Sequence, residues 1–171
     1  MNYYFHCYYF HPNYEFILRH VYGNNPFPEA KKIGDFINAN SKPEDNIVLI
    51  GSEPQIYFYT KKKCPSRHAY FAAIVDNIPE HKVWQREFVA DVEKVKPKYF
   101  IFFNHQISLF VQPNTDNYVF TWANKYIQDN YKLCGLVDMI DGQRSTYILD
   151  ESAQRYQPKS QSYIMIFERK I

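Results

Sequence analysis

Four short polar segments could do chemistry, because each lies at or just after the end of a predicted strand. They are Gly51-Ser52-Glu53, Asp76-Asn77, Asn104-His105-Gln106 and Asp138. In an open parallel sheet, ligands bind beyond the carboxyl ends of the strands, so we expect these segments to share one edge of the sheet. The candidate ligand-binding residues of this region are Ser52, Glu53, Arg67, Asn104 and His105.

The turn at Gly51 predicts the start of a helix. Ser52-Glu53-Pro54-Gln55 has the pattern of a capping box, in which the serine hydroxyl bonds to the amide three residues later. The free amide groups and the positive dipole end of such a helix suit an anion. The chain has neither the G-x-G-x-x-G nor the G-x-x-x-x-G-K-[ST] pattern of nucleotide sites. We therefore predict a tight turn rather than a dinucleotide site, and no cofactor.

Glu53 and Arg67 flank this predicted helix and could meet at its ends. A carboxylate near a helix N-terminus is favourable by roughly 0.3–1 kcal/mol. The plainer interpretation is an ion pair that fixes the loop, and the functional one is a role in binding a ligand. Lys61, Lys62 and Lys63 at the other end indicate either a solvated helix terminus or attraction to anionic lipid head groups.

Metal and nucleophile chemistry have no clear pattern in this chain. The six histidines show no H-E-x-x-H or similar spacing, so we predict no metal site. His105 is the one histidine expected at the carboxyl edge, where a polar loop residue is the plainer interpretation. Cys64, beside Lys63 and Arg67, could have a lowered thiol pKa, but no pattern pairs it with a base. We therefore predict no catalytic residue.

The composition indicates one ordinary globular domain. The chain has 171 residues, of which 46% are apolar and 22% are charged, and this length allows a sizeable core. A net charge of +2 is too small for the basic surface that duplex nucleic acid requires, so we predict no nucleic-acid partner. The longest apolar runs are far shorter than the ~20 residues that span a bilayer. The three cysteines leave any disulfide pairing open.

Strands separated by helices are expected along the chain. Helices are predicted to begin at Pro28 and at Ser52, to include the stripe from Trp84 to Val95, and to follow a cap at Asp116 or Asn117. Strands are predicted at 47–50, 68–75, 99–103, 133–139, 147–149 and 163–167. The last strand is expected at an antiparallel edge, and Asp141-Gly142 indicates a hairpin. Such an order is typical of right-handed β-α-β units, so we predict a three-layer α/β domain with a mainly parallel, Rossmann-like sheet.

Residues 1–25 form an aromatic N-terminal arm that differs in composition from the rest. Six of the first ten residues are aromatic, namely Tyr3, Tyr4, Phe5, Tyr8, Tyr9 and Phe10. The plainer interpretation is a segment packed over the sheet, because each ring buries about 150–250 Å². The alternative is a juxtamembrane segment, since amphipathic rings favour the head-group level of a bilayer. Residues 26–171 are expected to form the single α/β domain.

Several stretches resemble a known family. They are Asn24 to Ala30, Lys42 to Ile47, Gly51-Ser52-Glu53-Pro54-Gln55-Ile56-Tyr57-Phe58 and Cys64-Pro65-Ser66-Arg67-His68-Ala69-Tyr70. In order and spacing they resemble the carboxy-terminal extracytoplasmic domain of bacterial GT-C class membrane glycosyltransferases, which are similar to the dolichyl-phosphate-mannose protein mannosyltransferase superfamily. The resemblance extends from about residue 20 to the end of the chain, and its most specific part runs from Gly51 to Arg67.

The resemblance implies a membrane-spanning parent protein that uses a polyprenyl-phosphate sugar donor. Its acidic catalytic residues would lie between early transmembrane helices, outside this chain. The chain would be attached to the transmembrane portion of the same protein, on the periplasmic, extracytoplasmic face of the membrane. We expect it to cover the active site or to engage the acceptor, the lipid-linked sugar or the membrane surface, and to be catalytically silent alone.

Two alternatives from other classes stay open. A free-standing α/β enzyme or a small-ligand-binding domain would have a deep pocket near Ser52, Glu53, Asn104 and His105, with a strongly perturbed titrating group. A protein-interaction module would expose a contiguous apolar surface at the N-terminal arm, a surface that would equally suit the membrane-attached domain.

Overall fold

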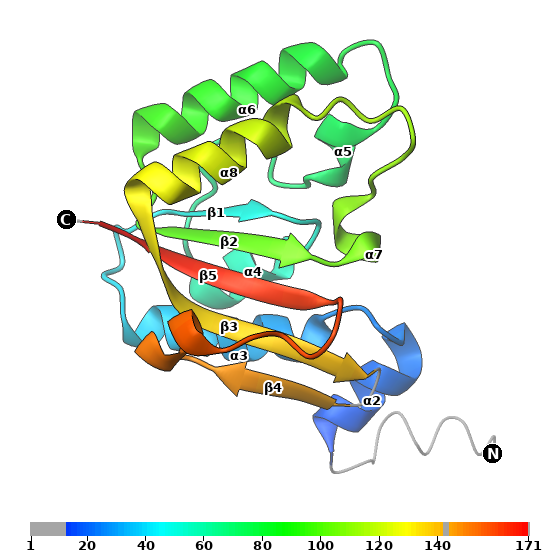
Figure 1. Cartoon of the computed structure of the whole chain (residues 1–171), viewed down its shortest axis with the longest axis vertical. Coiled ribbons are helices and arrows are strands. Elements are labelled where there is room, and N and C mark those ends of the chain that lie inside the picture. The colour runs from blue at the N-terminus through cyan, green and yellow to red at the C-terminus, as the bar shows by residue number, and fades with distance from the viewer. Residues whose placement is uncertain (1–12, 142–143, 171) are drawn as a thin grey trace.

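The computed structural model describes residues 13–141 and 144–170, and one five-stranded sheet organises them. The strands are β1 (Ile47–Ile50), β2 (Tyr99–Asn104), β3 (Tyr131–Asp141), β4 (Arg144–Ile148) and β5 (Tyr163–Arg169). Across the sheet their order is β1-β2-β5-β3-β4 (Figure 1). β1 and β2 pair in parallel, whereas the pairings of β2 with β5, β5 with β3 and β3 with β4 are antiparallel.

The prediction of a mainly parallel, Rossmann-like sheet is therefore wrong, and the position of β5 is the reason. β5 is antiparallel as expected, but it lies inside the sheet, between β2 and β3, and not at an edge. Its residues Ile164 and Ile166 are fully buried. The connection from β2 through α8 (Tyr118–Asn130) to β3 skips one strand position, which β5 fills. A pattern of alternating strands and helices cannot reveal a skipped position, because it constrains only neighbours in sequence.

The strand expected at 68–75 is also wrong. The last four residues of this range form the short helix α5 (Ala72–Val75), and the preceding residues belong to no strand. Phe71, Ile74 and Val75 are buried at the spacing of one helix face. A short apolar run fits a buried strand and a buried helix equally well, so the pattern did not distinguish them.

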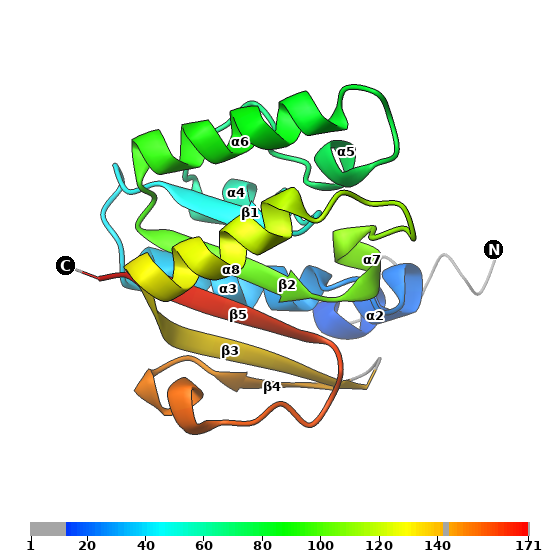
Figure 2. The ribbon, with the colours of Figure 1, turned by 45° about the horizontal axis from the view of Figure 1, so that its top comes forward.

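Helices cover both faces of the sheet (Figures 1 and 2). One face packs against α3 (Phe27–Ala39) and α4 (Gln55–Thr60), and the other against α5, α6 (His81–Val95) and α8. The other helices of the described residues are α2 (Tyr14–Tyr22), α7 (Gln106–Leu109) and the 3-10 helix η1 (Glu151–Arg155).

Successive side chains of each strand alternate between the two faces of the sheet and so contribute to two separate hydrophobic cores. Ile47 and Leu49 of β1 face α3 and α4 together with Ile101 of β2. Val48 of β1 and Phe100 of β2 face the other helical layer. Successive side chains of a strand point to opposite faces, so a strand covered on both faces must be apolar at every position. This requirement explains the uninterrupted apolar runs in the sequence.

The part of the aromatic arm that the structure describes begins at Asn13. The Asn13 side chain accepts a hydrogen bond from the Phe16 amide at 3.2 Å and caps α2, which ends at Gly23 with a left-handed φ of 57°. The aromatic run within the first ten residues lies outside the described residues. Among the described residues, no helix combines the length and the apolar character needed to cross a membrane.

The central position of β5 predicts a difference between two substitutions. Ile166→Ala should lower the free energy of unfolding by about 2–5 kcal/mol, because the truncation leaves a cavity in the core. Thr146→Ala, at an exposed position of the edge strand β4, should change it by less than about 0.5 kcal/mol. Urea denaturation followed by circular dichroism measures both values. Equal losses in the two variants would contradict the central place of β5.

Candidate functional site

Three strands end at one edge of the sheet, and this edge carries the candidate site. β5 is antiparallel to both β2 and β3, and β1 is parallel to β2, so β1, β2 and β3 run in one direction. We term the side where they end the carboxyl edge; it lies at the right of Figure 1, with α7 and α2 beside it. Segments 51–53 and 104–106 meet there as predicted. Asp76-Asn77 follows α5 instead of a strand.

Three buried side chains at the carboxyl edge form one hydrogen-bonded chain. The Ser108 hydroxyl donates to Glu53 Oε1, and His105 Nδ1 lies 3.2 Å from Ser108 Oγ. All three residues are buried. With the hydroxyl proton directed to Glu53, the neutral imidazole that completes this chain carries its proton on Nδ1 and donates it to Ser108. Sequence reasoning named Glu53 and His105 but missed Ser108, whose spacing of three residues from His105 was the available signal.

Glu53 is the acid of the carboxyl edge whose pKa departs clearly upward from its ordinary value. It is 4% exposed, and its Oε2 is buried with no hydrogen-bond partner. Burial raises the pKa of Glu53 from 4.5 to about 7, although the hydrogen bond from Ser108 opposes this change. A Cβ added at Gly51 would lie 2.7 Å from Glu53 Oε2 and 2.7 Å from Phe103 Cγ. Glycine is therefore required where the carboxyl group approaches the backbone.

The predicted capping box does not form. α4 begins at Gln55 behind Pro54, with no side-chain cap. The Ser52 hydroxyl instead accepts a hydrogen bond from the Ala72 amide at 3.0 Å and so ties the turn after β1 to the start of α5. The capping pattern was misleading, because an amide from a distant segment competes for the same hydroxyl.

His105 also borders a cavity of about 340 Å³ at the carboxyl edge. The other residues that line it are Asn24, Met139, Ile140, Asp141, Ser160, Gln161 and Ser162. Burial lowers the pKa of His105, and the nearby negative charge of Glu29 partly opposes this change. The ring is therefore neutral at pH 7, which leaves Nε2 as a hydrogen-bond acceptor.

Asn104 and Asp138 hold one wall of this cavity. Asn104 Nδ2 donates to the Gln161 carbonyl at 2.9 Å. The Asp138 carboxylate accepts hydrogen bonds from the Lys159 amide at 2.7 Å and from the Ser160 hydroxyl at 2.7 Å. Burial raises the pKa of Asp138, but these and neighbouring hydrogen bonds outweigh burial and lower it below its ordinary value. Both residues thus position the loop before β5.

Arg67 lies apart from the site, and the expected pair with Glu53 does not form. The guanidinium of Arg67 binds Glu87 of α6 through two hydrogen bonds of 2.8 Å, and His68 Nε2 lies 3.1 Å from the same carboxylate. The hydrogen bonds and charge of Glu87 raise the pKa of Arg67. Arg67 is exposed, so it pairs with the nearest surface acid rather than with the enclosed Glu53.

A second buried polar group anchors α2 near the carboxyl edge. Arg19 of α2 forms an ion pair with Glu29 of α3, and both side chains are buried. The Ser145 hydroxyl of β4 also donates to Glu29, at 2.5 Å. Arg19 Nε and Nη1 and Glu29 Oε2 have no hydrogen-bond partner. This pair was not predicted, because nothing in the local pattern marks two residues ten apart in sequence as buried partners.

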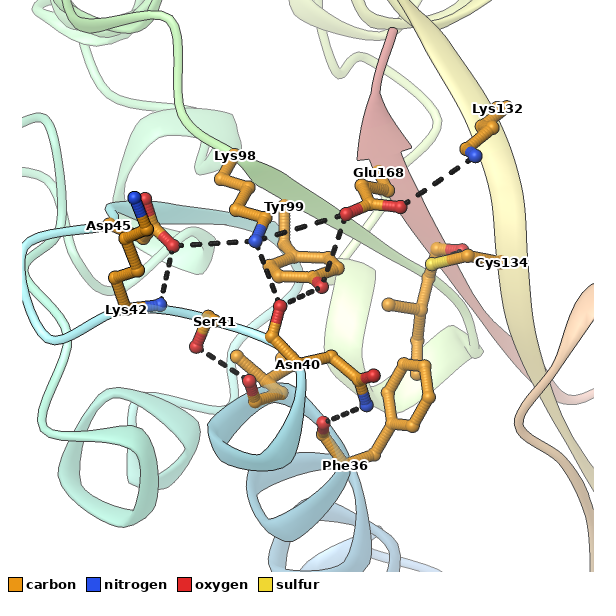
Figure 3. Close-up of polar contacts among 12 residues, drawn as sticks. Phe36, Asn40, Ser41, Lys42, Asp45, Lys98, Tyr99, Lys132, Cys134 and Glu168 are labelled. Carbon is orange, nitrogen blue, oxygen red and sulfur yellow. Dashed lines mark hydrogen bonds and ion pairs between the residues drawn. The ribbon is translucent and has the colours of Figure 1, made fainter. Parts of the chain in front are cut away.

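The opposite edge of the sheet holds a different polar cluster, drawn in Figure 3. Lys98 Nζ donates to the Asn40 carbonyl at 2.8 Å and lies 3.9 Å from Glu168, while the Tyr99 hydroxyl donates to the same carbonyl at 2.9 Å. These contacts join the end of α3 to β2 and β5. They make a structural clamp, since the charged groups neutralise one another.

The two cysteines that the structure describes are not activated. Burial raises the pKa of Cys134 to about 12, and burial likewise raises the pKa of Cys64. The expectation of a lowered Cys64 pKa beside Lys63 and Arg67 is therefore wrong, because desolvation of the thiolate dominates. Within residues 13–141 and 144–170, no group of three or more metal-ligating side chains is placed to hold a metal ion.

The chain matches no protein-family model, and comparisons with curated proteins and with solved structures find no match.

The raised pKa of Glu53 predicts a pH dependence that Glu53→Gln removes. Between pH 4.5 and about 7 the folded protein holds a proton that the unfolded chain releases, so stability falls as the pH rises through this window. The slope is at most about 1.4 kcal/mol per pH unit. Glu53→Gln keeps an acceptor for Ser108 without the charge. The free energy of unfolding of the variant, relative to that of the wild type, should therefore increase from pH 4.5 to 7 and then level off. Urea denaturation at a series of pH values measures the difference, and parallel profiles would disprove the assignment.

Proposed function

We propose that this chain is the extracytoplasmic accessory domain of a membrane glycosyltransferase that uses a polyprenyl-phosphate sugar donor. In this proposal the domain is attached to the transmembrane portion of the same protein, with its carboxyl edge toward the membrane. It covers the membrane-embedded active site or engages the acceptor or the lipid-linked sugar. It does not catalyse glycosyl transfer alone.

Two of the segments that carry the family resemblance support the proposal, because they contribute to the carboxyl edge. Gly51 and Glu53 form the turn after β1, where the glycine gives room to the buried carboxyl group. Asn24 lines the cavity beside His105, and Glu29 forms the buried pair that holds α2. The other two segments lie elsewhere, with Asp45 beside Lys98 at the opposite edge and Arg67 bound to Glu87 of α6.

The observation that carries the proposal is the concentration of exposed apolar side chains at this edge. Twelve large apolar side chains are exposed among the described residues, and seven of them belong to α2 and to the segment around α7. The seven are Tyr14, Phe16, Val21, Tyr22, Ile107, Phe110 and Val111. Both segments lie beside the carboxyl edge in both views of the ribbon (Figures 1 and 2). Such a concentration is typical of a surface that contacts a membrane or another protein.

The backbone holds these side chains in place. The buried pair of Arg19 with Glu29 fixes α2 on α3, so the exposed rings of α2 are presented in one orientation. Phe110 has a φ of 53°, in the left-handed region where glycine or asparagine is usual. A bulky ring that is exposed at such a position contributes little to the core, which favours a role at the surface.

A vesicle-binding experiment tests the apolar edge directly. The double variant Phe110→Asn, Val111→Ser should weaken co-sedimentation of the chain with phosphatidylglycerol vesicles by about tenfold, because it removes two apolar contacts with lipid. Phe110 is 46% exposed and Val111 is 50% exposed, so the fold should persist. Val83→Ser on α6, where the valine is 63% exposed, is the matched control. An equal effect of the control, or no effect of the double variant, would argue against a membrane-facing edge.

Cell fractionation tests the class of protein. An antiserum against the chain should detect, in cells that make the native protein, a membrane-integral polypeptide far larger than 20.6 kDa. The purified chain should transfer no sugar from a polyprenyl-phosphate donor, while membranes containing the large polypeptide should do so. A soluble native species of 20.6 kDa, or turnover by the purified chain, would refute the proposal.

A second candidate is a free-standing enzyme or small-ligand-binding domain at the same edge. The specific observation in its favour is Glu53, whose pKa burial raises to about 7, the range useful for general acid–base chemistry. Against it, Glu53 is enclosed by Gly51, Phe103 and Ser108. The turnover measurement on the purified chain distinguishes the two candidates.

A further inference from the structure

We propose that the cavity beside His105 binds a neutral ligand rich in hydroxyl groups, of the kind that a glycosyl residue presents. The assignment of a glycosyl ligand rests on the proposed function and deepens it, since it places contact with a sugar at a defined site in this domain. Three features of the described residues support it: the chemistry of the cavity lining, the fixed orientation of the His105 ring, and the unpartnered carboxyl oxygen behind it.

The lining of the cavity suits a neutral polar ligand. Its volume of about 340 Å³ lies within the range of small-molecule sites, about 300–1,000 Å³. Amide and hydroxyl groups come from Asn24, Ser160, Gln161 and Ser162. No lysine or arginine is among the described residues that line it, so it has no cation to recognise a phosphate.

Asp141 is the acidic residue among the described residues that line the cavity, and its charge is compatible with a neutral ligand. The Asp141 carboxylate accepts hydrogen bonds from Arg144 at 2.8 and 3.1 Å, so its charge is compensated within the hairpin. Asp141 therefore disfavours an anionic ligand without creating a site for a cation. A hydroxyl-rich ligand can donate to carboxylate and carbonyl oxygens and accept from amide groups, which is the mixture that this cavity offers.

The hydrogen-bonded chain behind His105 determines what the ring presents to the cavity. When the Ser108 hydroxyl donates to Glu53, its oxygen accepts from His105 Nδ1–H, and this tautomer carries a lone pair on Nε2. Within the described residues, Nε2 makes no hydrogen bond, and His105 lines the cavity. A ligand hydroxyl in the cavity can therefore donate to Nε2. Ser108 and Glu53 act as positioning residues.

The enclosed Glu53 supports a site at this place. Its Oε2 is buried with no partner, close to Gly51, although an apolar side chain would pack there without that cost. Glu53 orients the imidazole of His105 through Ser108, and this role accounts for a carboxyl group at an enclosed position.

Imidazole NMR of the full chain tests the proposal without depending on a variant. The His105 ring signals are assigned and followed during titrations with methyl α-mannoside, methyl β-galactoside and inorganic phosphate. We expect at least one glycoside to shift the His105 signals saturably, with a midpoint in the millimolar range, and phosphate to leave them unchanged. His68, which contacts Glu87 and Trp84 away from this edge, is the internal control.

A Ser108→Ala variant tests the positioning role. The ring ¹⁵N shifts of His105 should change from a single Nδ1–H tautomer to a mixture, and the glycoside midpoint should rise at least about fivefold. The melting temperature shows whether the variant is folded. Ser108→Thr retains the hydroxyl and should restore both values if it folds, while an unchanged tautomer in a folded Ser108→Ala protein would overturn the role of Ser108.

Comparing titrations with free glycosides and with a lipid-linked sugar identifies the source of the glycosyl group. The same comparison separates this proposal from the proposed function. A shift with free glycosides supports recognition of an acceptor glycan, whereas a shift only with a polyprenyl-phosphate sugar in detergent micelles supports recognition of the donor. No shift with any of these at about 50 mM glycoside, or an equal shift with phosphate, would overturn the site. Cell fractionation would still decide the class of protein, so the two failures are distinguishable.

Discussion

Hydrogen bonding of β5 along both of its sides is the constraint on which the candidate site depends. β5 pairs with β2 through six residue positions and with β3 along most of its length. Because it is antiparallel to both, it makes β2 and β3 run in the same direction with one strand between them. Their carboxyl ends then lie at one edge with that of β1, so residues from distant parts of the chain share a site.

Buried polar groups are concentrated near that edge, and they differ in kind from those at the opposite edge. Glu53 with Ser108 and Arg19 with Glu29 leave donors and acceptors unpartnered inside the protein. The cluster around Lys98 and Glu168 is instead partly exposed and internally compensated. Unpartnered buried groups reduce stability, so a region that accumulates them is a better candidate for function than a balanced clamp.

Sequence reasoning found part of this site and missed the rest for identifiable reasons. Ser52, Glu53, Asn104 and His105 were expected at strand ends, and the structure does place them at the carboxyl edge. Arg67 was assigned to Glu53, but Glu87 of α6 lies closer across the fold. Ser108 was missed because it follows the strand by several residues, and its role depends on how α7 turns back toward β1.

Local physics determined the elements that the sequence alone could predict. The amphipathic stripes of α3, α6 and α8 and the apolar runs of β1 and β2 follow from helix and strand periodicity within a few residues. Strand order, the direction of most pairings, the helical state of Ala72–Val75 and the pKa of Glu53 were decided only by the tertiary structure. The reason is that these properties depend on free-energy differences between long-range contacts, and such contacts leave no periodic trace in the residues that make them.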